Sequence, residues 1–120
     1  LATLQAAIDE HRAEMATRRL ETLEDGIARR AAFLVKVLEL NDGQAAEVTS
    51  ILEGTIPERT AILIALRDGT MEIEDALYQG YLLAEQTAEA IRAVLTTEQA
   101  AVFDALKMLI PGHHRGPGGP

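Results

Sequence analysis

Apolar residues recur at intervals of three and four along most of this 120-residue chain, with short polar stretches between the runs. Such spacing places the apolar side chains on one face of an α-helix. Before Leu40 there are two stripes, offset from each other; they comprise Leu4, Ile8, His11 and Met15, then Leu20, Leu23, Ile27, Ala31, Leu34 and Leu38. We expect one long helix here, or two joined near Gly26, because glycine costs a helix interior about 1 kcal/mol.

Residues that cap or break helices divide the rest of the chain into further segments. We expect helices at Asn41 to about Glu53, at Thr55 onward with Glu58 completing its cap and Pro57 in its first turn, at Thr70 to Leu95, and at Thr96 to a stop at Pro111. A kinked continuous helix through Pro57 is the alternative to a restart. Gly80, inside the Thr70 helix, predicts close approach by another helix. The inward residues of the last helix are Val102, Phe103, Leu106, Leu109 and Ile110.

The pattern therefore predicts an all-α protein of four to five helices, arranged as long antiparallel hairpins. Residues 1–110 form a single domain with an extended N-terminal helix, and residues 111–120 form a disordered tail rich in Gly, Pro and His.

Two helix starts share one local pattern. Leu95 ends an apolar run, Thr96 follows it, and Gln99 stands three residues after Thr96; Leu40, Asn41 and Gln44 repeat the arrangement more weakly. The pattern is a capping box, in which the cap side chain accepts from the backbone N–H of the glutamine and the glutamine side chain accepts from the backbone N–H of the cap. We assign both motifs a structural role.

A run of apolar residues at positions 61–66 is the best sequence indication of a partner surface. Its residues cover every side of a helix, so one helix face cannot bury them all. The residues predicted to contact a partner or client are Ile62, Leu63, Ile64 and Leu66, with Met71 and Ile73.

Charge and composition narrow the classes of partner. The net charge is -8, which disfavours nucleic acid because binding phosphates needs a basic face. Most of the acid lies between Val37 and Leu106, where the balance is -10. The absence of Cys excludes disulfides and thiolate chemistry. Small, mostly aliphatic core residues bury little area each, so we expect a homodimer.

No run reaches the ~20 apolar residues that span a bilayer, so we expect no membrane insertion by this sequence. The chain begins at Leu1 rather than Met, which indicates a processed or trimmed form. A signal peptide or an anchor upstream is compatible with that start.

Candidate chemistry is sparse. His11 and Met15 are four residues apart and share a helix face, where they would suit a soft metal. His113 and His114 in the tail would collect Zn, Cu or Ni weakly. Ordinary stripe residues and a solvated tail account for both pairs, so we expect no metal or other cofactor. No phosphate loop, nucleophile elbow or metal-binding helix motif is present, and we expect no enzyme activity.

The paired motifs resemble the LTxxQ motif of the Spy/CpxP group of periplasmic stress proteins. The sequence from Leu95 to Gln99 matches it well, and that from Leu40 to Gln44 is degenerate, with Asn41 in place of Thr. The resemblance covers about residues 33–109. It implies a periplasmic helical fold, an intertwined homodimer, and binding either of unfolded client proteins without ATP or of an envelope sensor kinase.

A metal-binding branch of that group comprises the CnrX-like and zinc-resistance-associated proteins. Its histidine and methionine ligands would fall near Ala31, Val35, Thr87 and Ile91, none of which is a usable ligand. This chain also departs from the basic surface of Spy-like members through its acidic middle, which would suit basic clients or a dedicated partner.

Three hypotheses remain open from the sequence. The chain is a periplasmic chaperone-like or envelope-stress protein, a metal sensor or metal-binding resistance protein, or a structural helical subunit of a larger complex.

Overall fold

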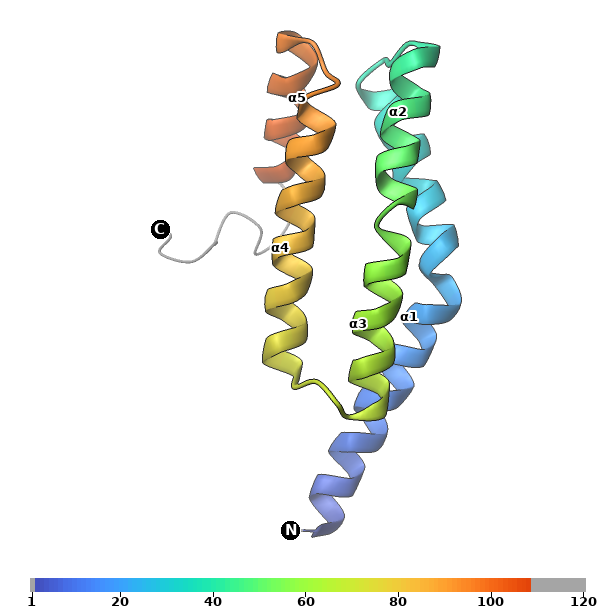
Figure 1. The fold of residues 1–120 in the computed structure, drawn as a ribbon, viewed down its shortest axis with the longest axis vertical. Coiled ribbons are helices and arrows are strands. Elements are labelled where there is room, and N and C mark those ends of the chain that lie inside the picture. Colours follow the sequence, from blue (N-terminus) through green and yellow to red (C-terminus); the bar gives the residue numbers. More distant parts are fainter. Residues whose placement is uncertain (1, 109–120) are drawn as a thin grey trace.

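The structure, a computed structural model, describes residues 2–108, and every regular element among them is an α-helix (Figure 1). The helices are α1 (Ala2–Val37), α2 (Asp42–Glu53), α3 (Ile56–Asp68), α4 (Ile73–Arg92) and α5 (Thr97–Met108). The all-α prediction is confirmed for this part of the chain. On the last helix Phe103 is buried and Leu106 packs against the core, as predicted, but the inward prediction for Val102 is wrong, because Val102 is 44% exposed. Leu109 and Ile110, also expected on the inward face, and the tail at 111–120 lie outside the described residues.

The molecule is long and flat, with dimensions of 54 × 33 × 17 Å. Helix α1 runs most of its length, and α2 and α3 return along it one after the other (Figure 1). Helix α3 packs against both α1 and α4, while α5 lies beside the upper part of α4 (Figure 1). The N-terminal end of α1 extends beyond the turn that joins α3 to α4 (Figure 1).

Two expected breaks are milder than the sequence suggested. Helix α1 continues through Gly26 without interruption. Gly54 and Thr55 keep right-handed helical dihedrals between α2 and α3, so the join resembles the kinked continuous helix more than a fresh start. Pro57 stands in the first turn of α3, as predicted. The predicted cap at Thr55 is wrong, because its Oγ1 donates to the Leu52 carbonyl at 2.7 Å and makes no cap bond.

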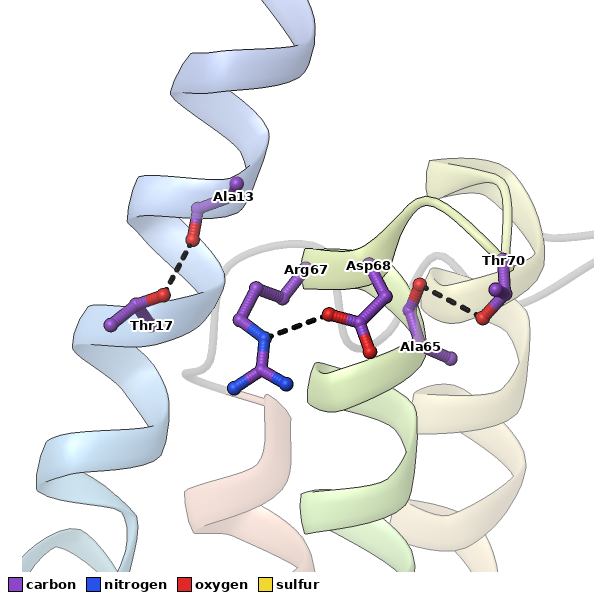
Figure 2. A network of polar contacts seen from close by, with 6 residues as sticks. All are labelled: Ala13, Thr17, Ala65, Arg67, Asp68 and Thr70. Atoms are coloured by element: carbon purple, nitrogen blue, oxygen red, sulfur yellow. Dashed lines mark hydrogen bonds and ion pairs between the residues drawn. The ribbon is translucent and has the colours of Figure 1, made fainter.

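The turn after α3 also corrects a predicted cap. Gly69 has a φ of 79°, a left-handed conformation that ends helices and favours glycine. The turn brings Thr70 back toward the last turn of α3, where its Oγ1 donates to the Ala65 carbonyl at 3.2 Å (Figure 2). Thr70 therefore helps to end α3. Helix α4 begins instead after Glu72 and ends at Arg92, three residues before the predicted Leu95.

The core lies where α1, α2, α4 and α5 meet. Its buried residues are aliphatic except for one phenylalanine; they are Ile27, Ala31, Leu34 and Leu38 from α1 and its end, Val48 and Leu52 from α2, Ala88 and Ile91 from α4, and Phe103 from α5. Helix α3 has no fully buried residue. The half of the molecule that α3 occupies is thus less well covered than the half around α2 and α5.

Candidate functional site

The two capping motifs meet at one end of the molecule. Gln44 donates its backbone N–H to Asn41 Oδ1 at 2.8 Å, and its own Oε1 accepts from the Asn41 backbone N–H at 3.1 Å. Gln99 and Thr96 repeat this exchange at 3.1 and 2.9 Å. Both expected capping boxes are formed, so Asn41 in place of threonine preserves the geometry.

The same two glutamines also bind each other. Gln44 Nε2 donates to Gln99 Oε1 at 2.8 Å, and Gln99 Nε2 donates to Gln44 Oε1 at 3.2 Å. Each amide sends its second N–H to the backbone beside the opposite motif, Gln44 to the Val94 carbonyl and Gln99 to the Leu38 carbonyl, both at 3.1 Å. Every donor and acceptor site of the two amides is therefore used.

This amide pair joins residues 55 positions apart and links the start of α2 to the start of α5. The sequence indicated two separate local caps, since each box is complete within four residues. What it did not indicate was contact between them. The available signal was that both motifs place a glutamine, with spare donors, at the third position.

A second feature is an open groove between α1, α3 and α4. It has a volume of about 430 Å³ and an apolar lining that comprises Leu23 and Ile27 of α1, Ile62, Leu63 and Leu66 of α3, and Ile73, Ala76 and Leu77 of α4. Leu77 is 69% exposed and Ile73 is 44% exposed. The groove therefore leaves large apolar side chains of two neighbouring helix turns in contact with water, and apolar grooves of this kind are often binding sites.

Four of the six residues expected on a partner surface line this groove: Ile62, Leu63, Leu66 and Ile73. Ile64 and Met71 do not. Ile64 is 37% exposed elsewhere on α3, and Met71 lies in the turn before α4. The sequence missed the contributions of α1 and of Ala76 and Leu77, because nothing in a helical stripe says which neighbour is absent.

Two glycines open onto the same groove from opposite helices. Gly26 of α1 and Gly80 of α4 both line it, and a Cβ built at either one meets no atom within 4 Å. Among the described residues, therefore, no helix makes the close approach to Gly80 that the sequence predicted. Gly80 faces the open space of the groove instead of a packed helix.

The charged residues that line the groove are all basic, although the chain as a whole is acidic. These residues are Arg19, Arg30 and Arg59. Ion pairs between described residues join Arg12, Arg18, Arg67 and Arg92 to carboxylates, and none of them includes the three groove arginines.

Arg59 is the most constrained of the three. Its Nε donates to Thr55 Oγ1 at 3.1 Å, so the residue expected to cap α3 instead positions a guanidinium. Burial lowers the pKa of Arg59 from its ordinary value, and the positive charge of Arg30 lowers it further. Both effects disfavour the charged form, and a carboxylate beside Arg59 would relieve them.

The metal candidates gain no partners among the described residues, where no three His, Cys, Asp or Glu side chains lie together. His11 is exposed and Met15 is 40% exposed on α1. His113 and His114 lie outside the described residues. No helix in the described part of the chain is long and apolar enough to cross a membrane.

No protein-family model matches this chain, and no curated protein or solved structure is significantly similar to it.

Proposed function

We propose that this protein binds other proteins on an apolar helical surface, as an ATP-independent chaperone-like or envelope-stress protein. The observation that carries the proposal is the groove, which leaves large apolar side chains such as Leu77 in contact with water. Burying such surface against a client is favourable by about 25 cal/mol per Å². Four of the six residues that the sequence predicted on a partner surface line this groove.

The periplasm and the Spy/CpxP group are part of this proposal, on the resemblance of the two motifs. The resemblance depends on two motifs occurring together, and in this chain the two motifs are linked because the side-chain amides of Gln44 and Gln99 bind each other. A local cap needs only one motif, whereas this pair needs both.

Client binding is expected to depend on Leu77. The wild-type protein should suppress aggregation of several unrelated denatured proteins at near-stoichiometric amounts without ATP. Leu77→Asp places a charge in the groove and should weaken suppression about tenfold, measured by light scattering. Val102→Asp is the matched control, because Val102 is 44% exposed on α5 and does not line the groove. Lack of suppression by the wild type with every client tested would refute the proposed function.

We also propose an intertwined homodimer built from long antiparallel hairpins, with the projecting end of α1 as a contact surface separate from the groove. That end exposes Leu4 and Ile8, by 61% and 46%, and Met15, 40% exposed, continues the stripe beside the turn that joins α3 to α4. They lie on one side of the helix at spacings of four and seven.

Ile8→Asp is expected to shift the protein from dimer to monomer at micromolar concentration, because a charge at a shared apolar contact loses its hydration. Analytical ultracentrifugation measures this directly. Ala6→Asp, at an exposed position on the opposite side of the helix, is the control. A wild-type monomer, or equal dissociation of both variants, would remove the projecting end of α1 as the dimer contact.

A further inference from the structure

The groove has the shape left by a missing helix. Its lining residues on α1 run from Arg19 to Arg30 at intervals of three and four, a length of about 17 Å at 1.5 Å per residue. Shorter stripes of α3 and α4 face the same space. At the other end of the molecule Phe103 of α5 is buried in the core cluster together with residues of α1, α2 and α4. At the groove no described helix takes the equivalent place.

Gly26 and Gly80 indicate how closely an occupant would approach. Each lies inside a helix, where glycine is less stable than alanine, and a Cβ added at either position would meet no described atom within 4 Å. Nothing within the described fold therefore requires glycine at these two positions. A backbone packed against them from outside would require it, because a Cβ would then occupy the space of the incoming chain.

The occupant's backbone conformation follows from hydrogen bonding. The groove walls are helices whose backbone groups are already bonded within each helix. An extended segment lying there would lose water from its N–H and C=O groups and find no partners for them. A helix satisfies those groups itself, so it is the favoured occupant.

The charge of the groove favours one class of helix over others. Arg19, Arg30 and Arg59 line the groove together with its apolar residues and take part in none of the ion pairs between described residues. Carboxylates beside the apolar stripe of an incoming helix would pair with them. Basic clients, which the overall charge of the chain suggested, would meet like charge here.

We propose that the groove between α1, α3 and α4 binds one amphipathic helix of a partner protein whose apolar stripe is flanked by acidic residues, with its backbone packed against Gly26 and Gly80. This inference rests on the proposed protein-binding function and names the class of partner. The chain's own residues 109–120 fit poorly by charge, since they contain Arg115 and no acidic side chain.

Three synthetic peptides test the charge preference. Each is about 18 residues, or five helical turns, with the same leucine stripe, and they differ only in having Glu, Gln or Lys beside it. The Glu peptide should bind at least about tenfold more tightly than the Gln peptide by fluorescence anisotropy, and the Lys peptide should bind more weakly still. The preference should shrink as salt rises from 50 to about 500 mM.

Paired variants of the protein test the named residues. Arg30→Gln should weaken Glu-peptide binding about tenfold, whereas Arg29→Gln, the same change one residue away and outside the groove, should not. Gly80→Ala should raise the thermal midpoint of the free protein and yet weaken peptide binding about fivefold or more. If Gly80 had a purely structural role, the substitution would not raise the thermal midpoint and weaken peptide binding at the same time.

Equal binding of the three peptides, or equal effects of Arg30→Gln and Arg29→Gln, would overturn the proposal. So would weakened self-association of Gly80→Ala in sedimentation, which would assign the groove to a second copy. If unfolded clients are protected but the Glu peptide is not preferred, only this inference fails. If the Glu peptide binds and no client is protected, the chaperone-like function fails and the helix-binding site stands.

Discussion

Replacing either Gln44 or Gln99 with alanine is expected to destabilise the fold by about 2–3 kcal/mol, measured by urea unfolding followed by circular dichroism. Loss of a capping interaction accounts for about 1 kcal/mol. The rest arises because each substitution removes the partner of the other amide and of a backbone carbonyl, at Val94 or at Leu38. These groups are partly buried, so water replaces the lost bonds only in part.

A double-mutant cycle separates the mutual bonds from the local caps. If the two amides act together, Gln44→Ala and Gln99→Ala combined should cost about 1–2 kcal/mol less than the sum of the single changes. Gln86→Ala is the matched control, since Gln86 is exposed on α4, and its effect should stay within about 0.5 kcal/mol of zero. Strict additivity would mean that each glutamine serves its own cap alone. All measurements need one protein concentration, because dimerisation would shift the apparent stability.

Local chemistry was predictable where a few neighbouring residues decide it. The helix starts at Asn41 and Thr96 each depend on a few consecutive residues. Thr55 and Thr70 are also residues of a type that caps helix starts. In the structure, however, each lies at the end of the preceding helix, and its hydroxyl donates to a carbonyl of that helix. Which helix end a threonine serves depends on the turn, and a sequence window does not contain the turn geometry.

The groove was only partly predictable for a different reason. The apolar run on α3 shows that this helix needs more cover than its own domain provides, and Ile62, Leu63 and Leu66 do line the open space. Stripes on α1 and α4 look the same whether a partner helix is present or absent. Only the structure shows that no described helix covers these stripes. It also shows that three arginines line the groove, which the net charge of -8 did not suggest.

The largest single loss of stability is expected from Phe103→Ala. Phe103 is 7% exposed and is the one buried side chain described on α5, where it contacts the core formed by α1, α2 and α4. Removing a buried phenylalanine costs about 3–5 kcal/mol, through lost apolar burial and the cavity left behind. Leu106, which packs against the core, the Gln99 amide and the exposed Arg92–Asp104 ion pair at 3.0 Å also attach α5 to the described fold. An exposed ion pair contributes at most about 1 kcal/mol.

Loss of Phe103 should therefore release α5 before the rest of the molecule unfolds. Hydrogen exchange measured by mass spectrometry should show faster exchange across Thr97–Met108 in the variant, while α3 keeps its wild-type rate. Val102→Ala, the neighbouring change at a 44% exposed position, should alter the unfolding free energy by less than about 1 kcal/mol. If hydrogen exchange instead became faster by the same factor in every helix, α5 and the rest of the described fold, including the groove, would unfold as one unit.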